Sequence, residues 1–250
     1  MAGSATIRAG LLCLTLIPAA FSTSRAQAVR LQYTPVVGQV TRYRIVGQAW
    51  PGGDTTAAPI TTTMYQTQTV LAMDGPNYVI KTVMDSTISS AGARDMMRGM
   101  AITTHVDPRG QVLSSEVTPP PGLPPFIANM LQRNGSQSSN SNRQTVLPDR
   151  ALNVGDTWTD SVTSAMGGGR GSRPQQVTYL VTYKLERVDG HVATISMNGT
   201  VQGGATGTMA GEMQLDLGAG RLTHLVTSSA FQAQGGGGTA RAKSTMDMLP

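Results

Sequence analysis

The side chains best suited to chemistry are three histidines, fourteen acidic residues and one cysteine, and they are scattered along the 250-residue chain. His105, His191 and His224 do not fall at His-x-x-x-His or His-x-His spacing, and no acidic residue accompanies them at metal-ligand spacing. No Asp-x-Asp-x-Asp-Gly run is present either. The sequence therefore predicts no metal site.

Nucleophilic and acid–base catalysis have little support in the sequence. No Gly-x-Ser-x-Gly motif occurs, so a serine nucleophile would lack the strained turn that presents it. The acidic residues fall mostly in expected turns or at outward strand positions, which does not suit the paired carboxylates of a glycosidase. We expect no catalytic residue, no cofactor and no enzyme activity. A hydrolase is the remaining catalytic alternative.

The lone cysteine, Cys13, lies in an N-terminal export signal. Arg8 is followed by an apolar run over residues 10–17, which is too short to cross a bilayer as a helix. Ala26-Gln27-Ala28 then fits the small-x-small rule of signal peptidase, and we expect cleavage after Ala28. Leu12 precedes Cys13 where a lipoprotein signal has a small residue. The sequence predicts an exported protein, periplasmic or extracellular, whose mature chain has no thiol.

The mature chain is mildly basic. Residues 1–28 hold two of the 19 basic residues and none of the 14 acids, which leaves a formal charge of +3. The basic residues are dispersed and no aromatic residues are interleaved with them, so nucleic-acid binding is not expected. No later apolar run approaches 18 residues, and we expect no transmembrane segment in the mature chain.

The mature chain has the pattern of antiparallel β-structure. Apolar and polar residues alternate over 78–88, 177–185 and 212–217, with Ile88 on the expected apolar face. Asp74-Gly75 and Asp189-Gly190 separate alternating runs, as hairpin turns do. One short helix is expected over 126–133, ended by Asn134-Gly135. The predicted fold class is mainly β, a curved antiparallel meander of one or two sheets with one bridging helix.

Three ordered landmarks indicate an internal duplication. Val37-Gly38 and Val154-Gly155 are 117 positions apart, and the two Asp-Gly hairpins are 115 apart. Gly110 and Gly220 are 110 apart, and an amide or basic residue and then an aliphatic residue follow each. We predict a signal peptide over 1–28, a first β-rich half over 29–135 that ends in the helix, a Ser/Asn-rich linker over 136–145, and a second half over 146–250.

The openings of the two predicted halves, over 31–38 and 147–158, together with Asp107-Pro108-Arg109-Gly110, resemble secreted bacterial families of unknown function. The chain is also distantly similar to periplasmic lipoprotein carriers. That resemblance implies a curved antiparallel half-barrel whose concave face holds acyl chains. It carries over no catalytic residue.

Methionine is abundant, with thirteen residues in the mature chain, and several fall on expected inward faces. It serves either as filling for a core poor in phenylalanine or as the lining of an adaptable apolar groove. We therefore predict a protein that binds a lipid or another apolar molecule on a concave sheet face. The alternative is a structural or interaction protein of the envelope that pairs with a protein partner through a sheet edge. The candidate groove residues are Tyr78, Ile80, Met84, Tyr179, Val181, Tyr183, Met213 and Leu215.

Overall fold

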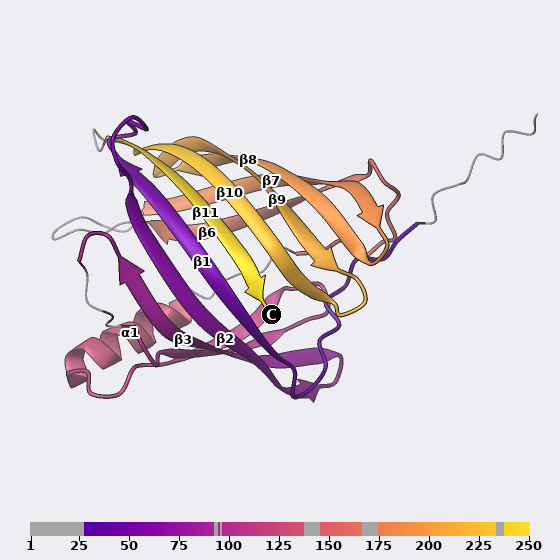
Figure 1. The fold of residues 1–250 in the computed structure, drawn as a ribbon, viewed down its shortest axis with the longest axis horizontal. Helices are drawn as coiled ribbons and strands as arrows, with labels where there is room; N and C mark the ends of the chain where they lie inside the picture. The colour runs from indigo at the N-terminus through magenta and orange to yellow at the C-terminus, as the bar shows by residue number, and fades with distance from the viewer. Residues whose placement is uncertain (1–27, 93–94, 96, 138–145, 167–174, 234–237) are drawn as a thin grey trace, which may run out of the picture.

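The computed structural model describes residues 28–92, 95, 97–137, 146–166, 175–233 and 238–250, which form one antiparallel sheet of eleven strands and one helix (Figure 1). The predicted signal peptide lies outside the described residues except for Ala28, and so does most of the predicted linker. The elements are β1 Val40–Pro51, β2 Ile60–Asp74, β3 Asn77–Ser89, β4 Ala101–Val106, β5 Val112–Thr118, α1 Pro125–Gln137, β6 Thr157–Met166, β7 Gln175–Asp189, β8 Val192–Gly203, β9 Ala205–Asp216, β10 Arg221–Ala233 and β11 Thr239–Leu249.

The sheet is a meander with one rearranged connection, and its order is β5-β4-β3-β2-β1-β11-β10-β9-β8-β7-β6. We call β1 to β5 the first half and β6 to β11 the second half. They join where β1 pairs with β11. The edge strands β5 and β6 do not pair with each other, so the sheet curves without closing (Figure 1). The predicted fold class is confirmed, and it takes the form of one sheet rather than two.

Strand β11 lets two halves of the same orientation share one antiparallel sheet. It runs antiparallel to both β1 and β10, so β1 and β10 point the same way. Without it, β1 and β10 would have to pair as parallel strands, which a simple meander does not provide.

Within the described residues, no helix is long and apolar enough to span a membrane.

The turns that open the two halves are held by the same hydrogen bonds. Gly38 N donates to Val70 O (2.8 Å), and Gly155 N donates to Leu185 O (2.7 Å). Val70 N in turn donates to the carbonyl of Gln39, as Leu185 N does to the carbonyl of Asp156, both at 3.0 Å. Gly38 and Gly155 both have positive φ, 83° and 95°, which glycine adopts without strain.

The β-bulges of the two halves also match. Leu71 and Glu186 are the unpaired residues, each three positions before the aspartate of its hairpin turn. Leu113 and Thr223 are likewise unpaired, each three positions after Gly110 or Gly220. Bulges are specific features that related domains conserve. The matched bulges support the duplication, which stays a prediction about the origin of the chain.

A further bulge in β3 corrects one expectation. Met84 pairs with Gln66 and Ser86 pairs with Tyr65, so Asp85 is the extra residue. Because one extra residue exchanges the two faces of a strand, the residues after Asp85 that were expected to face inward face outward. Ile88 was expected on the buried face and is instead 63% exposed. Helix α1 also continues past Asn134-Gly135, where its end was expected, to Gln137.

The largest core lies on the concave face of the second half, and we call it the filled core. Leu185, Ile195 and Leu215 supply its floor and are at most 1% exposed. Leu31, Leu147 and Leu152 cover it. Reciprocal backbone hydrogen bonds between Val29 and Leu152, at 2.7 and 2.8 Å, hold the two covering segments together. Residues 29–33 thus pack on the second half, although the sequence places them before the first.

Candidate ligand-binding site

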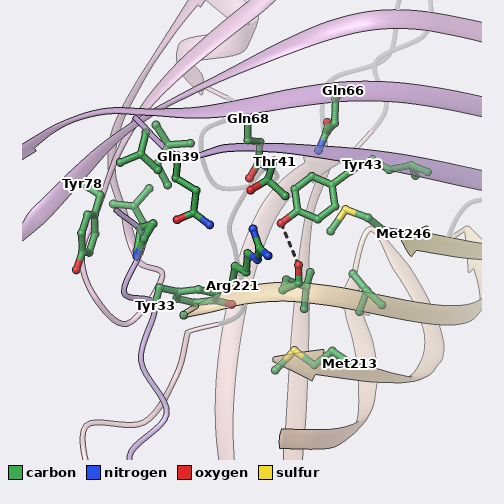
Figure 2. A pocket seen from close by; sticks show the side chains of 18 of the residues that line it. Tyr33, Gln39, Thr41, Tyr43, Gln66, Gln68, Tyr78, Met213, Arg221 and Met246 are labelled. Atoms are coloured by element: carbon green, nitrogen blue, oxygen red, sulfur yellow. Dashed lines mark hydrogen bonds between the residues drawn. The ribbon is translucent and has the colours of Figure 1, made fainter. Parts of the chain in front are cut away.

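The concave face is hollow where the two halves meet. A cavity of about 330 Å³, which we call the junction cavity, is lined from the first half by side chains of β1, β2 and β3 and from the second by β9, β10 and β11 (Figure 2). Tyr33 and Pro35 of the N-terminal segment border it. This volume lies at the lower end of the range for small-molecule sites in proteins.

One cation lies inside the junction cavity. Arg221 is the first residue of β10, and Figure 2 shows its guanidinium among Tyr33, Thr41 and Tyr43. Its Nε is buried and has no hydrogen-bond partner. No carboxylate among the described residues forms an ion pair with it. A buried donor nitrogen without a partner is costly, so Nε needs water or a ligand.

The turn before Arg221 is fixed by the N-terminal segment. Thr34 N donates to Gly220 O at 3.2 Å, and a Cβ on Gly220 would collide with the backbone N and Oγ1 of Thr34. Gly220 also has a positive φ of 56°, so both the backbone conformation and the lack of space for a Cβ favour glycine there. On the other half, Tyr33 N donates to Pro108 O at 2.9 Å. The segment therefore connects the equivalent turns of the two halves, next to the cavity.

Two buried tyrosines flank Arg221 as neutral groups. Tyr43 is 4% exposed, and its hydroxyl donates to Leu222 O at 3.0 Å (Figure 2). Burial raises the pKa of Tyr43 to about 12, although the positive charge of Arg221 lowers this pKa by a smaller amount. Burial also raises the pKa of Tyr33, and the nearby Tyr183 and Tyr43 add to that effect. Neither phenol supplies a negative charge to Arg221 near neutral pH.

The side chains of Thr41, Gln66 and Gln68 continue the polar wall along β1 and β2. Thr41 is opposite Gln68 and Tyr43 is opposite Gln66, and all four residues line the cavity. Gln66 is buried, yet no hydrogen bond joins its side-chain amide, or that of Gln68, to another described residue. These amides are free to bind water or a ligand.

The opposite wall of the junction cavity is apolar. The bulge at Thr223 places Leu222 and Leu225 on the same face, because they pair with Leu215 and Met213. Met246 of β11 and Ile45 of β1 are paired neighbours that extend this wall. The site thus combines a cation and amides on one side with a flexible apolar surface on the other, as an amphipathic molecule requires.

A smaller cavity of about 130 Å³ adjoins the first. It shares Gln66, Gln68, Ile80 and Val106 with the junction cavity and extends along the first half to Met84. Its further lining includes Thr82 and Thr104. The inner face of the first half is therefore open and partly polar along β2 and β3.

The structure separates the eight candidate groove residues into two groups. Tyr78 and Ile80 line the junction cavity, and Met84 lines the smaller one. Met213 belongs to both groups, because it borders the junction cavity and is buried in the filled core at 1% exposure. Val181, Tyr183 and Leu215 are buried in the filled core, and Tyr179 packs against it. The sequence interpretation did not select Arg221, Tyr43 or the two glutamines. In the sequence, Arg221 is recognisable only as the basic residue that follows the turn glycine Gly220.

The histidines lie apart from the cavity. His224 Nδ1 is 2.6 Å from Asp247 Oδ1 across β10 and β11. His105 is on β4, and His191 is in the turn before β8. Among the described residues, no group of three or more histidine, cysteine or acidic side chains is placed to hold a metal ion.

Comparison with known proteins gives only distant similarity. No family model matches the chain, and no curated protein matches it. Rv2717c from M. tuberculosis is similar in structure at 10% identity and a TM-score of 0.31, over 87% of this chain and 94% of that one. The hypothetical lipoprotein YmcC from Escherichia coli is similar at 10% identity and a TM-score of 0.28, over 86% and 89%. At these TM-scores neither similarity supports an argument about function.

Proposed function

We propose that this chain is an exported, non-enzymatic protein that binds a lipid or another amphipathic small molecule on the concave face between its two halves. The junction cavity carries this proposal. A cavity of about 150 Å³ accommodates benzene, so 330 Å³ has room for roughly a dozen carbon atoms.

The chemistry of the walls supports a binding role over a packing defect. A defect in a core is lined by apolar side chains and stays dry. Here Arg221, Gln66 and Gln68 face the space without bonds to other described side chains. Polar groups kept at such positions cost stability unless a bound molecule or water satisfies them. A site for a ligand accounts for both the space and its lining.

The other functions considered from the sequence are not favoured by a particular contact. Strand β6 is a free edge of the sheet, but nothing among the described residues indicates which partner would pair with it. The His224–Asp247 pair lacks a hydroxyl nucleophile among its described contacts. Sheet-edge pairing and hydrolysis therefore stay untested predictions, as does export.

Filling the cavity tests the proposal. Met246→Trp places a bulky indole ring in the junction cavity, whereas Met73→Trp makes the same change at a side chain that is 53% exposed. We expect an apolar fluorescent probe to bind the wild type and the Met73→Trp control alike, and to bind Met246→Trp at least about tenfold more weakly, a loss of roughly 1.4 kcal/mol. Equal affinities in all three proteins, measured by fluorescence titration, would contradict the proposal.

A further inference from the structure

Arg221 defines the class of ligand more closely. We propose, on the basis of the function above, that the ligand of the junction cavity is an amphipathic anion of medium length, with an oxyanion head bound by Arg221 and an apolar tail on the methionine and leucine wall. The observation that carries this is a guanidinium inside the cavity with its Nε buried and unpartnered. A guanidinium matches the geometry of a carboxylate or phosphate head and forms strong charge-assisted hydrogen bonds with either.

No described carboxylate forms an ion pair with Arg221. Among the described residues, Asp107 is the one carboxylate that lines the cavity. Its Oδ1 accepts the backbone N–H groups of Arg109 (2.9 Å) and Gln111 (2.7 Å), which hold it in its own turn. Tyr43 is buried as a neutral phenol, and its proton is donated to Leu222 O. The positive charge is therefore available to a ligand.

The cavity also contains donors and a surface that suit the rest of such a molecule. The side-chain amides of Gln66 and Gln68 lie across from Arg221 in Figure 2 and offer N–H groups to the same head. Met246 lies beside Tyr43 and Met213 lies below Arg221 in Figure 2, and both line the cavity. A chain of about ten carbons fits the volume, scaled from the cavity that accommodates benzene.

The equivalent turn of the first half shows that this cation is a local feature. Gly110 precedes Gln111 in the turn equivalent to Gly220-Arg221, and Gln111 is exposed. The two turns are built alike, since Asp107 and Asp216 each accept two backbone N–H groups through Oδ1. The turn itself does not require an arginine, because a neutral amide stands in the first copy.

The test compares ten-carbon ligands that differ only in their head. Isothermal titration is run with decanoate, decyl phosphate and 1-decanol on the wild type, Arg221→Met, Arg221→Lys and the control Arg241→Met, which changes an exposed arginine of β11. We expect the wild type and Arg241→Met to prefer at least one of the two anions over decanol by about 10- to 100-fold. Arg221→Met reduces that preference to near one, and Arg221→Lys, which keeps the charge, retains part of it. The better of decanoate and decyl phosphate identifies the source of the head group.

The apo protein gives a second, independent measurement. Because Arg221 has an unpartnered buried nitrogen, Arg221→Met should raise the melting temperature of the empty protein by about 2–4 °C. A lower melting temperature for Arg221→Met would instead indicate a structural role and overturn the inference. Equal binding of anions and decanol by the wild type would overturn the anionic head and leave the apolar cavity standing. Binding of none of the three would overturn both proposals.

Discussion

The two halves share one backbone design and differ in what their inward side chains do. In β7 of the second half, Val181, Tyr183 and Leu185 face the filled core and are at most 7% exposed. The residues 115 positions earlier, in β2, are Gln66, Gln68 and Val70, and all three line the junction cavity. The strand pairings match as well, since Gln68 is opposite Thr82 where Tyr183 is opposite Met197.

The difference is clearest at one pair of neighbouring strands. Trp158 of β6 stacks on Tyr183 of β7, with ring centroids 5.2 Å apart and planes 15° from parallel. The equivalent pair in the first half is Thr41 of β1 and Gln68 of β2. Two large rings are thus replaced by a hydroxyl and an amide. The same backbone supports a packed core in one place and a cavity in the other, according to side-chain volume and polarity.

The cover of the sheet follows the same division. Leu31 and Leu147 are wholly buried against the second half. Only the edge of the N-terminal segment, at Tyr33 and Pro35, reaches the junction cavity. The second half therefore holds most of the packed core, and the first half and the junction hold the open space of the proposed site.

The largest expected effect comes from one substitution made at equivalent isoleucines. Ile195 is 0% exposed in the filled core, and Ile80, at the equivalent position, borders both cavities. Ile195→Ala should lower the free energy of unfolding by about 3–4 kcal/mol, because it leaves a void in a close-packed site. Ile80→Ala should cost only about 1 kcal/mol, because the removed atoms already face a space.

Urea unfolding of the two isoleucine variants measures this difference. Ile80→Ala should also bind the ligand more weakly. The folded fraction of Ile195→Ala should bind it with the affinity of the wild type. Equal losses of stability would mean that the first half is packed as tightly as the second, and would break the comparison.

Alkaline pH tests the buried phenol of the junction. Tyr43 corresponds to Asp160 in the second half, so no equivalent phenol stands at that position there. The pKa of Tyr43 in the folded protein is about 12, above the ordinary value of 10. Its contribution to the free energy of unfolding is therefore fully present below pH 10 and is lost as the pH rises from 10 through 12. One proton gives a fall of about 1.4 kcal/mol per pH unit in that window, and the raised pKa of Tyr33 adds to it.

The variant Tyr43→Phe separates two contributions of this residue. It loses the hydrogen bond to Leu222 O, which costs about 1 kcal/mol at every pH. It should also reduce the slope of unfolding free energy against pH above 10, in urea titrations from pH 8 to 11.5. A slope identical to that of the wild type would show that Tyr43 does not titrate on unfolding in this range.

Much of the fold could be predicted because it depends on local patterns. Asp74-Gly75 and Asp189-Gly190 are turn sequences with a physical reason, and both connect the hairpins expected from them. Alternation located the strands but failed after Asp85, where a bulge that no residue type announces reversed the faces and exposed Ile88.

The site could be predicted only in part, because alternation identifies inward residues but not what covers them. Tyr78 and Tyr183 both face inward, yet one lines a cavity and the other lies in the filled core. The deciding contacts come from Leu31 and Leu147, which are distant in sequence from the strands they cover. Arg221 follows a turn glycine and resembles a solvent-exposed hairpin residue, so the burial of its Nε depends on the same long-range packing.

The smallest expected change in stability comes from giving the first half the side chains of the second. The double variant Thr41→Trp/Gln68→Tyr transfers the Trp158–Tyr183 pair to its equivalent strands. The rings should occupy the junction cavity and weaken probe binding at least about tenfold. The free energy of unfolding should stay within about 1 kcal/mol of the wild type, because buried apolar area offsets imperfect packing. The matched control is Val40→Trp/Thr69→Tyr, a neighbouring pair in the same two strands whose Val40 is 55% exposed, and it should bind the probe as the wild type does. If the double variant still binds the probe with full affinity, side-chain volume at positions 41 and 68 is not what distinguishes the open half from the filled one.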